Sequence, residues 1–215
     1  DPYKLVLALA DRFQALGGRI EKGEVTGFAR SDRIREIILK DGRRLPADEV
    51  VICAGAFSAK LAKDLGEPIP LETERGYHTQ IMAPGISMKH SIIWPARAFM
   101  VTPTAGGIRV GGTVEMAGLD APPDYRRAKV TVKRAREALP NLTCEDFTEW
   151  MGHRPALPDT VPILSASART PGLFYATGHG HLGLSLSAIT GQCVADLVAG
   201  RKPALPVEPF RATRF

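Results

Sequence analysis

Two stretches of this chain, far apart in the sequence, share one pattern: a short apolar run reaches glycine and leads into a helix. The first comprises residues 49–56 and the second residues 173–178. A continuous apolar run of this kind predicts a strand buried on both faces, as in a parallel sheet covered by helices. A buried strand, a small-residue turn and a helix start form the type of crevice where α/β sheets bind ligands. The sequence therefore predicts at least part of an α/β domain with a ligand crevice.

The second stretch continues through Gly178, Gly180 and Gly183, in the spacing Gly-x-Gly-x-x-Gly, into a helix predicted over residues 184–198. Glycines permit a tight turn, and bare amide groups at a helix start can face an anion or a polarised carbonyl. The spacing matches the dinucleotide fingerprint, but no second strand with an acidic ribose ligand follows about 20 residues later. A glycine turn needed only for packing is the alternative, and the sequence leaves both open.

Two other chemistries fit the same segment less well. Residues 183–187 resemble a nucleophile elbow, but Ser187 stands where the closing glycine belongs, and no acid that would complete a triad is evident. His179 and His181 suggest a metal site, but no third ligand is apparent and the helix separates the pair. We therefore predict no metal site.

Helical periodicity and turn residues outline the amino-terminal third. Leu5, Leu9, Phe13 and Leu16 recur at helical spacing before a stop at residues 17–18, which predicts an amphipathic helix. The other elements predicted here are strands over residues 19–21, 25–28, 34–40 and 43–47, with a two-residue turn at 41–42, and a helix over residues 58–65 with Ser58 as its N-cap.

The residue pattern changes between residues 68 and 154, where short apolar stretches are separated by proline and glycine. This predicts a mostly antiparallel sheet with one helix over residues 124–139. The order α/β, β-rich, α/β predicts that residues 68–154 form a domain inserted into another, made of residues 1–67 and 155–215. The strands predicted in the insert are residues 75–82, 92–94, 99–104 and 108–113.

The formal net charge of +5 raises the question of a nucleic-acid partner. The basic residues are densest in the helix predicted over residues 124–139, where they interleave with apolar residues as on a solvated helix face. No aromatic residues stand among them to stack on bases, and no recognised binding motif accompanies them. We predict no nucleic-acid partner, and a basic phosphate-binding protein is kept as a rival. The cluster comprises Arg126, Arg127, Lys129, Lys133, Arg134 and Arg136.

Cysteine usage and hydropathy bear on the compartment. Cys53, Cys144 and Cys193 are widely spaced and form no Cys-x-x-Cys pair, so neither a disulfide framework nor a zinc site is indicated. No apolar run reaches the roughly 18 residues of a membrane span, and the start lacks the pattern of a secretory leader. We expect a cytoplasmic protein, or one peripheral to the inner face of the membrane. The absence of an initiating Met suggests a piece of a longer protein.

Residues 151–163 contain a candidate substrate ligand. Arg154 lies between Gly152 and Pro155 in a mostly apolar setting, which suits bidentate capture of a carboxylate. A structural ion pair explains such an arginine equally well.

Residues 151–163 followed by 172–183 resemble the carboxyl-terminal signature of the D-amino-acid oxidase/dehydrogenase family of flavoproteins, which includes glycine and sarcosine oxidases. Residues 49–58 resemble the strand and glycine turn beside the cofactor in that family, and residues 74–78 resemble a segment of its bacterial dehydrogenase branch. The amino-terminal Gly-x-Gly-x-x-Gly unit of the family's fold is absent. The resemblance therefore implies the carboxyl-terminal part of such an enzyme: part of an FAD-binding α/β domain with an inserted, mostly antiparallel β-sheet substrate domain.

The resemblance implies FAD as cofactor and oxidation of a small amino acid or secondary amine by hydride transfer to flavin N5. Arg154 would bind the substrate carboxylate. Tyr77 and His78 would lie in or near the substrate site, with a core tyrosine and a structural histidine as the alternatives. Positions implied beside the flavin are Val25, Ala54 and Gly55, near its adenosine and pyrophosphate, and Gly178, His179, Gly180, His181, Leu182, Gly183 and Leu184, at the turn and helix start.

Three further expectations concern partners. The electron acceptor is oxygen, a quinone or another protein, and the sequence does not choose among them. With the amino-terminal unit absent, the sheet has an open edge where homo- or hetero-oligomeric association is expected, and FAD binding by these residues alone is expected to be weak. A non-catalytic flavin-fold subunit of a larger assembly is the main alternative function.

Overall fold

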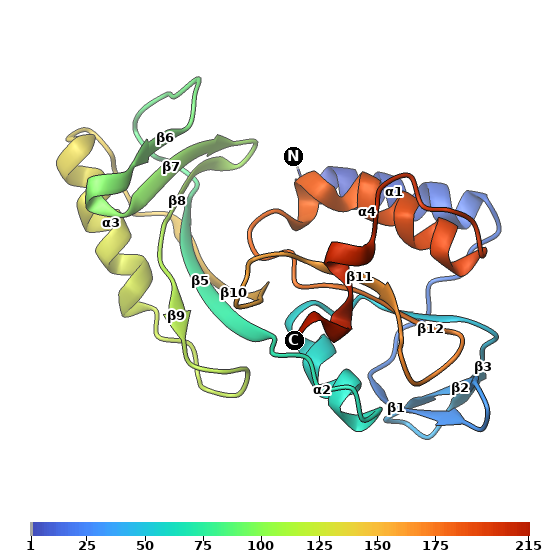
Figure 1. The fold of residues 1–215 in the computed structure, drawn as a ribbon. Coiled ribbons are helices and arrows are strands. Elements are labelled where there is room, and N and C mark those ends of the chain that lie inside the picture. Colours follow the sequence, from blue (N-terminus) through green and yellow to red (C-terminus); the bar gives the residue numbers. More distant parts are fainter. Residues whose placement is uncertain (1) are drawn as a thin grey trace. The chain divides into compact units, whose positions relative to one another are not determined.

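The computed structural model describes residues 2–215 as a mixed α/β fold with several sheets (Figure 1). The chain divides into two compact units, Thr73–His153 and the noncontiguous pair Pro2–Glu72 with Arg154–Phe215. Each unit has a hydrophobic core of its own. In chain order the helices and strands are α1 (Pro2–Ala15), β1 (Val25–Arg30), β2 (Ile34–Leu39), β3 (Arg44–Pro46), β4 (Val50–Ile52), α2 (Ser58–Asp64), β5 (Glu72–Ile81), β6 (Ile92–Trp94), β7 (Phe99–Thr104), β8 (Gly107–Gly111), β9 (Glu115–Met116), α3 (Arg126–Ala138), β10 (Phe147–Ala156), β11 (Ile163–Ala166), β12 (Leu173–Thr177) and α4 (Gly183–Val198).

The noncontiguous unit is built on a three-stranded sheet in the order β11-β12-β4. β12 pairs with β4 in parallel, with Tyr175 opposite Ile52, and β11 pairs with β12 antiparallel. Ala62 and Leu65, from α2 and its carboxyl end, share one core with these strands, and α4 packs on β11 and β12. The two strands predicted from the apolar runs are confirmed, and the structure pairs them with each other in parallel. Because β4 and β12 run in the same direction, their carboxyl ends lie at the same edge of the sheet.

Helix α1 forms as predicted, but none of its residues is buried. Leu5, Leu9, Phe13 and Leu16, the residues of the predicted apolar face, are 47–69% exposed. Large exposed apolar surfaces of this kind usually mark contacts with another chain segment or protein. The face that the sequence predicts as buried is thus left uncovered by the residues that the structure describes.

The hairpin predicted after residue 34 is present, with a longer loop. β2 and β3 pair antiparallel. The Leu39 amide donates to the Arg43 carbonyl, which leaves three residues in the loop, and Gly42 takes φ +87°. A three-residue loop that ends in a left-handed glycine is a common hairpin connection. The prediction of a two-residue turn at 41–42 is therefore wrong by one residue.

Other local predictions are wrong. Residues 19–21 form no strand. Ser58 is the first residue of α2 and Phe57 is the N-cap, so the serine hydroxyl does not cap the helix. Strands β9, β10 and β11 are present but were not predicted from the sequence. In β10 the apolar alternation is interrupted by Gly152 and Pro155, which are unfavourable in regular strands and obscured the pattern.

The unit Thr73–His153 contains an antiparallel sheet in the order β10-β5-β8-β7-β6, with β9 paired to β5. Figure 1 shows α3 against one face of this sheet, where Ala135 packs with apolar residues of the strands. Because side chains alternate along a strand, each residue of β5 is assigned to one face. The face toward α3 carries Thr73, Arg75, Tyr77, Thr79 and Ile81, all buried; the opposite face, here called the open face, carries Glu74, Gly76, His78 and Gln80.

A polar network fastens the loop that precedes α3. The Tyr77 hydroxyl, in a side chain only 1% exposed, donates to Glu115 at 2.5 Å and accepts from the Asp124 amide at 3.0 Å. Arg127 Nε donates to the same carboxylate at 3.1 Å, and the fully buried Arg75 has its Nε 3.5 Å away. The hydrogen bond from Tyr77 and the neighbouring Arg127 hold the pKa of Glu115 below its usual range. Burial raises the pKa of Tyr77.

We predict that Tyr77→Phe in the full-length protein lowers the free energy of unfolding by about 1–3 kcal/mol, because Glu115 and the Asp124 amide each lose a partner. Glu115 has a lowered folded-state pKa, so its stabilising contribution is present above the unfolded-state pKa and is lost as the pH falls through the folded-state value. The difference between the two proteins should therefore shrink below about pH 4. Urea unfolding at neutral and acidic pH measures it.

The matched control is Tyr125→Phe, since Tyr125 contacts the Tyr77 ring edge-on and is more exposed. Equal destabilisation by the two variants, or a Tyr77→Phe effect independent of pH, contradicts the assigned network.

Candidate functional site

Two glycine turns meet at the carboxyl ends of the parallel strands β4 and β12. The Thr177 hydroxyl, at the end of β12, donates to the carbonyl of Gly55, which follows β4, at 3.0 Å. Gly55, Gly178 and Gly180 have φ of +54°, +81° and +52°, a conformation that L side chains rarely adopt. The sequence therefore supplies glycine where the backbone requires it. The hydrogen bond fixes the two turns side by side.

Two different reasons for glycine, close packing and open space, apply to different residues of these turns. A Cβ on Gly178 would lie 2.2 Å from Leu157 Cδ1, so Gly178 is required by packing inside the protein. A Cβ on Gly55 or Gly180 would meet nothing within 4 Å. Both turns therefore present bare backbone to open space, where a ligand can approach closely. The sequence left open whether these glycines allow a ligand to approach or are needed only for packing. Gly178 is needed for packing, whereas Gly55 and Gly180 leave space for a ligand.

Helix α4 begins next to these turns, and the backbone amides of its first turn have no hydrogen-bond acceptor within the helix. Leu182 is its N-cap and donates its amide to the His179 carbonyl at 2.9 Å. In the part of the chain that the structure describes, no side chain caps α4. The amides of Gly183 and Leu184, in the first turn, have no intrahelical acceptor, and the helix dipole adds partial positive charge there. This end of α4 can therefore stabilise negative charge on a ligand.

The His179 side chain has a structural place in the same turn. Its Nε2 lies 3.0 Å from the Thr190 hydroxyl of α4. Burial lowers the pKa of His179, so the imidazole is neutral at physiological pH and can share one hydrogen with that hydroxyl. The contact ties the glycine turn to the helix.

Arg154 lies near the end of β10, and its neighbour in the sequence contacts the glycine turn. The Gly180 amide donates to the Pro155 carbonyl at 2.8 Å. The Arg154 side chain is half-buried. Within the noncontiguous unit, three segments thus converge: the turn at Gly55, the turn at 178–184, and the chain at Arg154.

Val25 forms no hydrogen bond, within the part of the chain that the structure describes, with the segments of this site. It begins β1 opposite Leu39, whereas β1 approaches the core at its other end. There Arg30 donates to the Leu65 carbonyl and to the Thr170 hydroxyl, both at 3.0 Å. No hydrogen bond among the described residues joins Val25 to Ala54 or Gly55, and its role beside the adenosine stays a prediction.

Tyr77 and His78 lie on opposite faces of β5, so they cannot line one pocket. Tyr77 points into the core toward α3, as the alternative of a core tyrosine expected. His78 is on the open face, and its ring centroid lies 5.1 Å from that of Trp150 in β10. Trp150 immediately precedes the motif at residues 151–163, and no role was predicted for it from the sequence.

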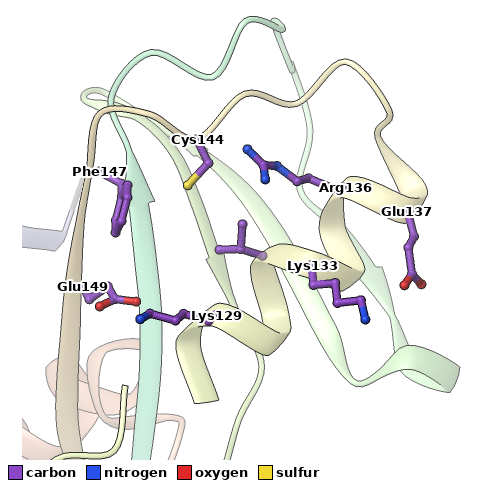
Figure 2. Close-up of a pocket in the computed structure, with 8 residues that line it drawn as sticks. Lys129, Lys133, Arg136, Glu137, Cys144, Phe147 and Glu149 are labelled. Atoms are coloured by element: carbon purple, nitrogen blue, oxygen red, sulfur yellow. The ribbon is translucent and has the colours of Figure 1, made fainter. Parts of the chain in front are cut away.

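A groove of about 570 Å³ lies elsewhere on the unit Thr73–His153, between α3 and β10 (Figure 2). Figure 2 shows Lys129 of α3 pointing toward Glu149 of β10. Phe147 also lines it, and alternation along β10 puts Phe147 and Glu149 on the opposite side of the strand from Trp150. The groove is therefore separate from the open face. Among the described residues, no cluster of potential metal ligands and no helix suited to crossing a membrane occurs.

Comparison with known proteins gives consistent matches. The D-amino-acid oxidase of Bradyrhizobium diazoefficiens is 37% identical over 219 residues, covering 100% of this chain and 52% of that protein. D-amino acid dehydrogenase 3 of Mesorhizobium japonicum is 35% identical over 187 residues, covering 83% of this chain and 45% of that protein. The chain spans about half the length of these relatives.

Solved structures of related enzymes also superpose on this chain. Glycine oxidase from Geobacillus kaustophilus superposes with a TM-score of 0.77 at 25% identity, covering 91% of this chain and 53% of that one. L-proline dehydrogenase from P. horikoshii shares the fold, with a TM-score of 0.85 over 100% of this chain and 60% of that one, at 23% identity. The family profile DAO, described as FAD dependent oxidoreductase, matches residues 1–197. The chain therefore belongs to the DAO family of FAD-dependent oxidoreductases.

Proposed function

We propose that this chain is the carboxyl-terminal part of a flavoenzyme that oxidises a small amino acid or secondary amine. The observation that carries the proposal is the convergence of three segments through two hydrogen bonds, from Thr177 to Gly55 and from Gly180 to Pro155. It brings the chain at Arg154 next to bare backbone that a cofactor can approach. The family is FAD-dependent, and the named relatives act on amino acids.

The residues present fit FAD. Gly55 and Gly180 offer open space beside the backbone, and the first turn of α4 offers amide donors. The Ser58 hydroxyl, fully buried just after Gly55, has no hydrogen-bond partner among the described residues. A buried hydroxyl is seldom left without one, so a missing group is expected nearby. We assign Ala54-Gly55 to the pyrophosphate side of FAD, and Gly180 with the start of α4 to the flavin ring.

In this proposal Arg154 holds the substrate carboxylate, and FAD, when bound, accepts the hydride from Cα. A bidentate guanidinium–carboxylate contact fixes both the position and the rotation of the substrate. The amides at the start of α4 would stabilise negative charge on a cofactor bound beside them. Positioning and electrostatics are thus the contribution of this chain, and the redox chemistry comes from the cofactor.

We further propose that the noncontiguous unit is the remainder of the FAD-binding domain and that Thr73–His153 is the substrate domain. The exposed apolar face of α1 and the outer edge of β4, the last strand in the order β11-β12-β4, are surfaces that the remaining part of the protein would cover. An unpaired strand edge and an apolar helix face both favour association. The same surfaces would serve the alternative function, a flavin-fold subunit without catalytic activity.

We predict that Arg154→Ala in the full-length protein lowers kcat/KM for carboxylate-bearing substrates at least ~100-fold, because a charge-assisted bidentate contact is lost. Steady-state kinetics measures the effect. Arg154→Lys should recover part of the loss, and Arg126→Ala, a change at an exposed arginine of α3, should leave kcat/KM unchanged. An unaltered kcat/KM in Arg154→Ala removes the carboxylate role.

We predict that Gly180→Ala weakens FAD binding on the order of 10-fold or more, because the new methyl occupies space that the flavin needs. Gly200→Ala is the matched control: Gly200 has φ +66°, and an added Cβ likewise meets nothing within 4 Å. Both variants carry the same backbone strain, about 1 kcal/mol. Equal FAD dissociation constants for the two variants argue against cofactor contact at Gly180.

We predict that residues 1–215 alone bind FAD weakly, because they span about half the length of the relatives. Spectrophotometric titration of the purified 215-residue protein with FAD measures this. Adding the remaining part of the protein as a separate polypeptide should restore binding. A stoichiometric flavin spectrum from the 215 residues alone contradicts the prediction.

A further inference from the structure

Helix α3 carries six basic residues, and the structure divides them into two groups of three. The first group has hydrogen-bond acceptors within the unit Thr73–His153 and comprises Arg126, Arg127 and Arg134. The second group has no hydrogen bond and no ion pair with any residue that the structure describes, and comprises Lys129, Lys133 and Arg136. All three members of the second group line the groove between α3 and β10, and no member of the first group does. The groove therefore collects the unpaired positive charge of the helix.

The three unpaired cations form one stripe along the helical wall of the groove. Residues 129, 133 and 136 are spaced by four and by three, so their side chains leave the same side of the helix. The helical rise separates the first from the last by about 10 Å along the axis. Figure 2 shows Arg136 extending toward Cys144, at one end of the groove. The stripe thus places positive charge along the whole length of this wall.

The carboxylates of the groove offset only part of this charge. Glu137 is held by Arg97, whose Nη1 lies 3.2 Å from its carboxylate. Glu149 of β10 faces Lys129, as Figure 2 shows. The other two cations of the stripe have no carboxylate of the groove opposite them. The end of the groove nearer the carboxyl terminus of α3 is therefore the end that favours an anion.

The floor and the opposite wall of the groove are apolar. Val132 and Cys144 pack against the hydrophobic core of the unit, and Phe147 of β10 is 44% exposed. The sequence shows no aromatic residue among the cations, but folding brings the phenyl ring of Phe147 into the same groove. The cavity volume of about 570 Å³ lies within the range of pockets that bind small molecules. The groove therefore combines an apolar surface with unpaired positive charge at the size of a small ligand.

We propose that this groove binds a free organic carboxylate with an apolar body. Phe147, Val132 and Cys144 contact the apolar body, while Lys133 and Arg136 contact the carboxylate. An ammonium and a guanidinium both form charge-assisted hydrogen bonds with carboxylate oxygens. The inference goes beyond the proposed function and does not rest on it, because all the groove residues belong to one unit and none is a proposed ligand of substrate or cofactor.

The thiol of Cys144 reports whether the groove is occupied, because it is free and lines the groove. The test is the rate at which iodoacetamide, a small neutral reagent, alkylates Cys144 in the full-length protein, followed by peptide mass spectrometry. Burial raises the pKa of Cys144, so the reaction is run at about pH 8.5 in every case. The probe is 2-naphthoate. Acetate supplies the carboxylate without the apolar body, and 2-naphthamide supplies the body without the charge.

We expect 2-naphthoate to slow the alkylation about 10-fold at ten times its dissociation constant, which should be on the order of 1 mM or lower. Acetate and 2-naphthamide at the same concentration should slow it less than about 2-fold. The double variant Lys133→Gln/Arg136→Gln should weaken the binding of 2-naphthoate on the order of 10-fold. The matched control Arg126→Gln/Arg134→Gln removes two cations of the same helix outside the groove and should leave binding unchanged.

Three outcomes overturn the inference. The first is no protection by 2-naphthoate, or equal protection by 2-naphthamide. The second is equal binding of 2-naphthoate by the two double variants. The third is that Cys144 of the folded full-length protein is not alkylated before the probe is added, because another part of the protein then fills the groove. Turnover plays no part in these measurements, so the inference and the proposed function can fail separately.

Discussion

The parallel pairing of β12 with β4 is the contact on which the candidate site depends. It joins segments more than a hundred residues apart and directs both strand ends to one edge, where Thr177 hydrogen-bonds to the Gly55 carbonyl. The buried apolar side chains of both strands hold the pairing in register. Without it the two glycine turns would be unrelated loops. The position of the candidate site therefore follows from core packing more than from any residue of the site itself.

A second constraint operates in the unit Thr73–His153, where successive side chains of β5 point to opposite faces of the sheet. The residues toward α3 form a buried polar network in which Tyr77 and Glu115 hold the loop before the helix. The alternate residues form the open face, where His78 meets Trp150. Two neighbouring residues of one motif thus have different surroundings, a buried polar network for Tyr77 and the open face for His78.

Several features of the fold could be predicted from the sequence because they are local. Helical periodicity predicted α1, the amphipathic pattern of basic and apolar residues predicted α3, and the small residues that follow a glycine turn predicted α4. Apolar runs ending in glycine predicted β4 and β12. Positive φ at Gly178 and Gly180 could be anticipated, because glycine alone adopts it without strain. Strand β10 could not be predicted from the sequence, because its local residue pattern is unfavourable for a strand. It forms a strand because it pairs with β5.

The sequence by itself determined the family, through two motifs in the right order and spacing, and it singled out Arg154 and the glycine turn as candidate site residues. Only the tertiary structure decided which residues share a surface. It separated Tyr77 from His78, placed Trp150 beside His78, and divided the glycines into one needed for packing and two that face open space. The reason is physical: composition and periodicity fix local conformation, whereas the neighbours of a side chain are set by pairings between distant strands.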